Sequence, residues 1–190
     1  LPVAHDGRPA ELSLDRRHDL LHPVGILCGH LDHPDRVKKL TVLDIAPPRR
    51  VFADTDQQLA TAYHHWFFLI QRAPYPETMI GNDVDFYLRS MMMRWGTGDD
   101  AITPEAFAEY LRCFSNPDTI HATSEDYRAA ATIDLDHDAA DQDTKIACPM
   151  QALWGKKAVM EKRYDVLAVW REHAETVSGQ AIGCGHFIPE

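Results

Sequence analysis

Apolar and polar positions follow two different patterns along the chain. Residues 40–45 (LTVLDI) form a short apolar, β-branched run, which is typical of a buried parallel strand. From about residue 56 to residue 133, apolar side chains instead recur every three or four positions, as in amphipathic helices. Strand-like runs return at 146–155 and 177–182, with an amphipathic helix predicted at 164–173. This order predicts a mostly parallel sheet interrupted by a helical insert.

Prolines and small polar residues divide the insert. The apolar spacing predicts one helix over 56–70, ended by the prolines that follow, and a second over 84–95. Thr103 and Asn116 each precede a proline, which is typical of a helix start, and they predict two further helices. The acid-rich stretch 134–143 has the spacing of no metal loop, so we interpret it as a solvated connecting helix.

Composition narrows the classes of function. The chain has 190 residues, of which 45% are hydrophobic and 25% charged, as in ordinary globular proteins. A net charge of −10 without a basic cluster argues against a nucleic-acid partner. No apolar run approaches the ~20 residues that span a bilayer, and no leader opens the chain, so we expect a cytoplasmic protein without a membrane partner. The cysteines are expected to be free thiols, because Cys28, Cys113, Cys148 and Cys184 are scattered.

Two candidate catalytic side chains follow predicted strands. Asp44 lies at the C-terminal end of the first strand, and His186 lies in a glycine-rich turn after the last one. The carboxyl ends of parallel strands meet at one edge of a sheet, where the sites of open α/β folds form. There an acid can orient a histidine that acts as a base. Each residue alone also has a structural interpretation: Asp44 as a helix cap or turn acid, and His186 as a structural histidine.

A second group of candidate residues lies in the helical insert, where His65, Trp66 and Tyr127 are aromatic side chains with polar tips. N–H and O–H donors in an apolar pocket suit a small anion, because a dry site strengthens each hydrogen bond to charge. Spacing alone favours a plainer interpretation. In it, Trp66 and Tyr127 belong to the core, and the histidines of the His64–His65 pair face solvent.

Several segments, in order along the chain, resemble one known family. They are DRVKKLTVLDIAP (35–47), AYHHWFFLIQ (62–71), FYLRS (86–90), EDYRAAATID (125–134) and CGHF (184–187). They look like the haloacetate (fluoroacetate) dehalogenases, which belong to the α/β-hydrolase superfamily and use an aspartate nucleophile. The resemblance runs from about residue 31 to the end of the chain.

The resemblance implies a partial α/β-hydrolase fold with a mostly parallel sheet. Residues 1–55 and 144–190 would form the core, and residues 56–143 a helical cap inserted after the acid-bearing strand. The N-terminal strands of the family pattern, with their H-G-x-P loop, are missing, and the chain stops just after His186. A sheet without those strands would expose an edge.

The resemblance also implies a reaction. In this family an aspartate displaces halide from a haloacetate and forms an ester, which a His–Asp pair hydrolyses with water. Asp44 matches the acid of that pair and His186 its base. The residues that match the rest of the family's pocket are His65, Trp66 and Tyr127, which hold the leaving halide, and Trp95, a tryptophan near the pocket. No metal or organic cofactor is implied; a haloacid and water are the implied partners, and a cytoplasmic homodimer is suggested.

The nucleophile is the least regular part of the resemblance. Family members carry a G-H-D-R-G-like turn. The most similar segment here is AHDGR at 4–8, which lies more than ten residues too far upstream. On this match the resemblance implies Asp6 as the nucleophile and Arg8 as a partner of the substrate carboxylate. Asp19 in RHD is the alternative, although no strand precedes it. Two other functions stay open: an epoxide hydrolase-like enzyme, and an inactive remnant without a competent nucleophile.

Overall fold

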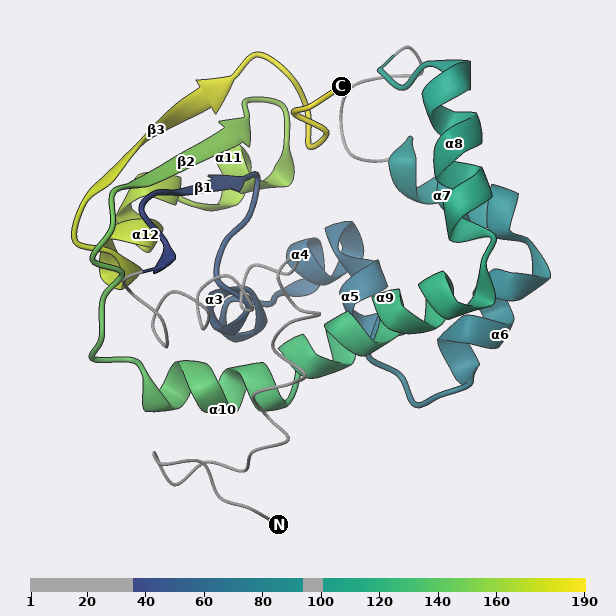
Figure 1. Cartoon of the computed structure of the whole chain (residues 1–190), viewed down its shortest axis with the longest axis horizontal. Coiled ribbons are helices and arrows are strands. Elements are labelled where there is room, and N and C mark those ends of the chain that lie inside the picture. The colour runs from purple at the N-terminus through teal and green to yellow at the C-terminus, as the bar shows by residue number, and fades with distance from the viewer. Residues whose placement is uncertain (1–35, 94–100) are drawn as a thin grey trace.

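A computed structural model describes residues 36–93 and 101–190 of the chain. In this part of the chain one parallel sheet forms, with the strand order β1 (Leu40–Leu43), β2 (Met150–Gly155) and β3 (Val177–Ile182). Leu40 pairs with Met150, and Met150 pairs in turn with Val177, so the strands begin in register and run the same way (Figure 1). The predicted parallel arrangement is therefore confirmed for these strands.

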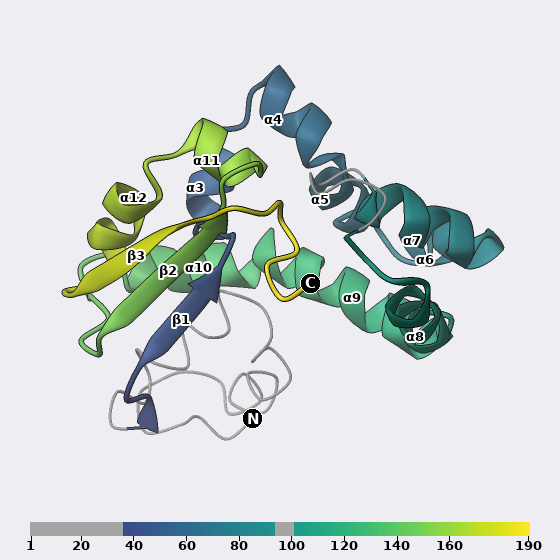
Figure 2. The same cartoon turned by 90° about the horizontal axis from the view of Figure 1, so that it is seen from above.

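Helices fill the two crossovers between the strands. Between β1 and β2 come α3 (Pro48–Ala53), α4 (Gln57–Ala62), α5 (His64–Leu69), α6 (Tyr75–Asn82), α7 (Val84–Met92), α8 (Pro104–Phe114), α9 (Pro117–Ala130) and α10 (Ile133–Ala140). Between β2 and β3 come α11 (Val159–Arg163) and α12 (Val166–His173). Figure 2 shows α11 and α12 on one face of the sheet, while α4 to α9 extend away from it. The helical insertion after the acid-bearing strand is thus present.

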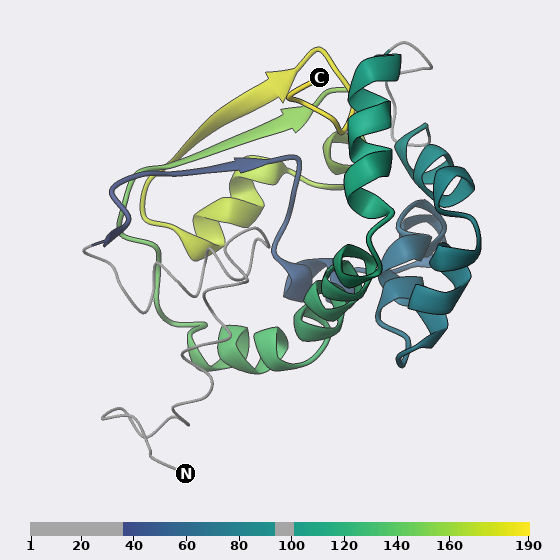
Figure 3. The same cartoon turned by 45° about the vertical axis from the view of Figure 1, so that its right-hand side comes forward.

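The core follows the alternation of β1, in which Leu40 and Val42 are buried while Thr41 and Leu43 are exposed. These side chains form one apolar cluster with Met150 and with the fully buried Trp170 of α12. A smaller cluster around Ile80 joins α5, α6 and α9 within the insert. Figure 3 shows the blue-to-teal helices of the insert gathered beyond the arrowheads of the strands. These helices of the insert therefore lie at the edge of the sheet where strand-end residues emerge.

The structure corrects two features of the predicted insert. The helix expected over 56–70 is two helices, because Tyr63 takes non-helical angles of φ −107° and ψ 34° between them. Its buried ring stacks on Trp66 with the centroids 6.0 Å apart, so the break places both rings in the core. The prolines that were expected to end this helix instead begin the next one: Pro76 lies in the first turn of α6, where its missing N–H costs nothing.

The remaining differences between the predicted and the observed helices are smaller. The helix expected over 84–95 is observed to Met92, and α11 was not predicted at all. The acid-rich stretch does form a helix, α10, although Asp134 in it is only 6% exposed and thus not solvated. Cys113, Cys148 and Cys184 are free thiols as expected, whereas Cys28 lies outside the described residues. Over 36–93 and 101–190, no helix has both the length and the apolar character that a membrane crossing requires.

Candidate functional site

Asp44 is positioned by the end of β1. Its N–H donates the last ladder hydrogen bond, 2.7 Å to the carbonyl of Leu153 in β2. Directly after the strand its backbone turns into the left-handed region, with φ 47°, which aspartate tolerates better than most residues. The side chain is only 1% exposed. A carboxylate held there must be satisfied by partners inside the protein, because its burial without them is costly.

Both carboxylate oxygens of Asp44 have such partners. Oδ1 accepts a 2.9 Å hydrogen bond from the backbone N–H of Gly155, which ends β2. Oδ2 lies 2.6 Å from Nδ1 of His186, in the loop after β3. The loops after three neighbouring strands therefore meet at one carboxylate, although Asp44 and His186 are 142 residues apart in sequence. The structure brings this predicted pair together.

Gly155 is a site residue that the sequence interpretation passed over. A Cβ on Gly155 would lie 2.0 Å from the carbonyl oxygen of Gly185, so only glycine allows the loop that carries His186 to pack this closely. A hydrogen bond of 3.0 Å from the N–H of Lys157 to the carbonyl of Cys184 joins the same two loops. The one signal in the sequence was the glycine turn at the end of the predicted strand.

This arrangement can carry acid–base chemistry. With its proton on Nδ1 and donated to Asp44, the His186 ring keeps Nε2 as the nitrogen that can accept a proton. The buried carboxylate then stabilises the charged ring that forms. The side chain of His186 is 35% exposed, so water can reach it while Asp44 stays dry.

The aromatic residues of the insert also come together. The Tyr127 ring on α9 contacts the His65 ring at 5.6 Å and the Trp66 ring at 5.9 Å between centroids, both edge to face. Trp66 is buried, and Tyr127 packs against both apolar clusters, as the plainer interpretation expected. His65, however, does not face solvent: it is 4% exposed, while His64 is the exposed member of the pair.

Burial raises the pKa of two tyrosines in this part of the core. For the Tyr127 phenol the rise in pKa is large, so the hydroxyl keeps its proton far into the alkaline range. Burial also raises the pKa of Tyr63, and the nearby carboxylate of Asp44 adds to that rise. Tyr63 stacks on Trp66.

Four predicted site residues cannot be placed against this geometry. Asp6, Arg8, the alternative nucleophile Asp19, and Trp95 lie outside the described residues. Their roles as nucleophile, carboxylate partner and pocket residue stay predictions.

Comparison with known proteins finds a similar protein of known activity and several similar solved structures. No family model matches the chain. A fluoroacetate dehalogenase from Burkholderia sp is 38% identical over 181 residues, which are 93% of this chain and 60% of that protein. A crystal structure from Nostoc sp PCC 7120, described as an alpha/beta hydrolase, is 57% identical with a TM-score of 0.84, covering 87% of this chain and 57% of that one. A mutant from Pseudomonas aeruginosa described as an epoxide hydrolase, with bound MFA, is 37% identical with a TM-score of 0.77, covering 84% of this chain and 55% of that one.

These similarities fix the architecture. The three parallel strands with their helical insertion are part of an α/β-hydrolase fold. The chain is a homologue of a fluoroacetate dehalogenase, and it spans 60% of that relative's length.

Proposed function

We propose that this chain supplies the water-activating pair and the leaving-group site of a hydrolase that removes halide from haloacetates. The observation that carries the proposal is the 2.6 Å contact between His186 Nδ1 and Asp44 Oδ2 at the ends of parallel strands. The 38% identity to a fluoroacetate dehalogenase supports the choice of a carbon–halide bond as the bond that is cleaved.

In the first step, an aspartate carboxylate attacks the carbon that bears the halogen. A carbon–oxygen bond forms as the carbon–halogen bond breaks, and the halide leaves with the electron pair. Asp6 is the proposed nucleophile, with Asp19 as the alternative. Arg8 is proposed to hold the substrate carboxylate, and Trp95 to lie near the pocket.

The leaving halide needs hydrogen-bond donors in a dry place. The N–H groups of His65 and Trp66 and the O–H of Tyr127 are proposed as those donors. The contacts of the Tyr127 ring with both the His65 ring and the Trp66 ring within the insert support this. Donors already fixed in place need little reorganisation when charge develops on the halide.

In the second step, His186 takes a proton from water through Nε2, and the resulting hydroxide adds to the ester carbonyl. The tetrahedral intermediate collapses, which returns the aspartate carboxylate and releases the hydroxy acid. Asp44 stabilises the imidazolium until it loses its proton to solvent. Water and haloacetate are thus the proposed partners, and no step draws on a metal or organic cofactor.

The organisation of the chain is a further part of the proposal. Residues 1–55 and 144–190 would form the hydrolase core, and residues 56–143 a cap that excludes water from the halide. A cytoplasmic homodimer is part of the same proposal.

The test is halide release from fluoroacetate and chloroacetate by the purified chain. The exposed His64, next to the proposed halide donor His65, provides a matched control. We expect His186→Ala to stop turnover after the first halide, because the ester is then no longer hydrolysed, and His64→Ala to leave turnover near the wild-type value. Equal release by His186→Ala and wild type would contradict the proposal.

An epoxide hydrolase is the second candidate, favoured by the 37% identity to a protein described as one. Enzymes of that class need tyrosine hydroxyls that protonate an alkoxide, and Tyr127 could serve. Turnover of a styrene oxide-type substrate without halide release from haloacetates would favour it. The third candidate is an inactive remnant without a nucleophile, which a covalent ester on Asp6 or Asp19 would rule out.

A further inference from the structure

We propose that Arg128 is a positioning residue for the halide donors. Through its hydrogen bonds to Glu77 and to the segment that follows α5, it determines how the Tyr127 ring packs against His65 and Trp66. This inference rests on the proposed function and adds to it a residue that does not touch the substrate. Arg128 follows Tyr127 directly on α9.

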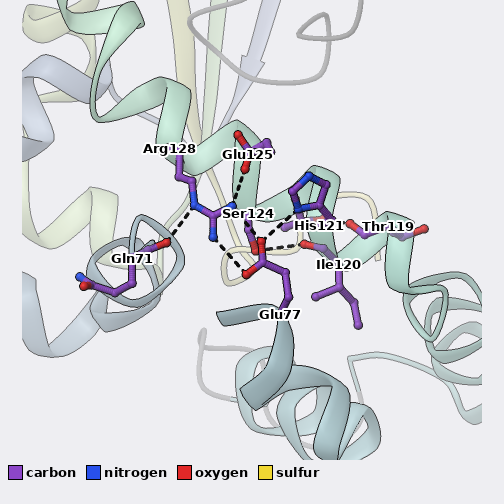
Figure 4. Close-up of polar contacts among 9 residues, drawn as sticks. Gln71, Glu77, Thr119, Ile120, His121, Ser124, Glu125 and Arg128 are labelled. Atoms are coloured by element: carbon purple, nitrogen blue, oxygen red, sulfur yellow. Dashed lines mark hydrogen bonds and ion pairs between the residues drawn. The ribbon is translucent and has the colours of Figure 1, made fainter. Parts of the chain in front are cut away.

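The guanidinium of Arg128 joins three segments of the insert (Figure 4). Its Nε donates 2.8 Å to the carbonyl of Gln71, two residues beyond the end of α5. Nη1 and Nη2 donate 2.8 and 3.1 Å to the two carboxylate oxygens of Glu77 in α6, a bidentate pair. Nη1 also lies 2.5 Å from the carboxylate of Glu125, one turn earlier on α9. One side chain therefore ties α9 to α5 and α6.

These anchors fix both the rotation of α9 and its distance from α5. Successive residues on a helix point about 100° apart. Arg128 can therefore hold the loop after α5 while Tyr127, its neighbour, faces the rings of His65 and Trp66. Helix α5 has only six residues, too few to be stable alone, so contacts with its surroundings decide where it lies.

The environment favours a firm anchor. The side chains of Arg128 and Glu77 are each 15% exposed. The hydrogen bonds from Arg128 are the main cause that holds the pKa of Glu77 at about 2, so the pair is ionised at neutral pH. His121 adds a 3.1 Å contact from Nδ1 to the same carboxylate. The ligand atoms of Glu77, His121 and Glu125 lie within 4.8 Å of one another. The guanidinium already bridges the carboxylates of Glu77 and Glu125. We therefore infer that Arg128, and not a metal ion, balances their negative charge.

The experiment measures chloride affinity, a readout that needs no turnover. Tryptophan fluorescence reports binding near Trp66, and the part of the signal lost in Trp66→Phe identifies it. Losing a positioning anchor should lower affinity about tenfold in Arg128→Met. Arg112→Met is the matched control, because Arg112 forms an exposed ion pair with Glu109 on α8, and its chloride affinity should equal that of wild type. Equal affinity in Arg128→Met and wild type would overturn the inference.

A double-mutant cycle separates positioning from general destabilisation. If Arg128 acts through Tyr127, Arg128→Met weakens chloride binding in wild type but changes it less than about twofold in Tyr127→Phe. An equal loss in both backgrounds would show that Arg128 only supports the fold, and would overturn the inference.

A third measurement separates failure of the inference from failure of the proposed function. If wild type binds no chloride, the proposed function loses its halide site. Nuclear Overhauser contacts between the Tyr127 and His65 rings then decide the positioning role alone. Contacts that weaken in Arg128→Met and persist in Arg112→Met support the role of Arg128; contacts unchanged in both overturn it.

Discussion

The sheet end and the helical insert hold their candidate residues in different ways. Asp44, Gly155 and His186 follow neighbouring parallel strands, and backbone hydrogen bonds of the ladder and loops fix where each side chain begins. The side chains then need to add only the contacts at one carboxylate. The geometry of the acid–base pair is thus carried mainly by backbone.

The insert has no such ladder. Its aromatic residues come from the six-residue α5 and from α9, and they meet through ring contacts and through the ion pair of Arg128 with Glu77. Side chains pack more adaptably than a backbone ladder. We therefore expect substitutions at the sheet end to act on the whole fold, and substitutions in the insert to act locally.

The largest effect is expected for Gly155→Val. The added side chain would clash with the backbone of Gly185, so unfolding free energy should fall by roughly 3 kcal/mol or more in urea denaturation. Gly81→Ala in α6 is the matched control: nothing lies within 4 Å of its Cβ, and alanine in a helix should stabilise by up to about 1 kcal/mol. A Gly155→Val variant as stable as wild type would refute the close approach of the two loops.

Trp170→Phe tests the anchor behind Asp44. The indole N–H of the fully buried Trp170 donates 3.0 Å to the carbonyl of Ile45, directly after the acid. Removing this donor leaves the carbonyl without that bond, at a cost of about 1–3 kcal/mol in unfolding free energy. Trp154→Phe, whose indole pairs with Glu161 on the surface, should cost less than about 1 kcal/mol. Equal losses of unfolding free energy in Trp170→Phe and Trp154→Phe would contradict the expected effect of burial.

Thr103→Ala tests whether the insert responds locally. The Thr103 hydroxyl accepts a 3.2 Å hydrogen bond from the N–H of Ala106 and caps α8, a helix without a buried residue. Its loss should cost about 1 kcal/mol, seen as faster amide hydrogen exchange in α8 with little change in the sheet. Thr103→Ser keeps the hydroxyl and should exchange like wild type. Faster amide exchange throughout the molecule would contradict the expectation that substitutions in the insert act locally.

Glu77→Gln is expected to have the smallest effect, up to about 1 kcal/mol near neutral pH, and that effect should depend on pH. The pKa of Glu77 is lowered from 4.5 to about 2, mainly by Arg128. A lowered acid pKa contributes stability that is complete above the unfolded value and is lost as pH falls toward the folded value. The stability difference between wild type and Glu77→Gln should therefore be constant down to about pH 4.5 and shrink below it. A difference that grows on acidification would contradict the ion pair.

Much of the fold could be predicted from the sequence, because two different periodicities mark strands and helices. β3 was predicted with its observed bounds, and the starts of α8 and α9 follow their caps. The break at Tyr63 could not be predicted, since the spacing of apolar residues continues through it and only the stacking on Trp66 in the folded core explains it.

The candidate site divides in the same way. Asp44 and His186 were paired from strand-end logic, and the structure places them in contact. Gly155 acts through its backbone N–H and Arg128 through contacts 51 and 57 residues away, and such long-range partners leave no local pattern. Among the contacts of Arg128 described above, the one with Glu125, three residues earlier on the same helix, is the one that spacing could have predicted.

We propose above that the Asp44–His186 pair hydrolyses an aspartyl ester. The most direct test mixes His186→Ala with fluoroacetate and follows fluoride release together with the mass of the intact protein. We expect the variant to release no more than one fluoride per chain and to gain the mass of one carboxymethyl group, which peptide mapping places on Asp6 or Asp19, while wild type turns over and stays unmodified. Sustained fluoride release by His186→Ala, or no fluoride from either protein, would contradict it.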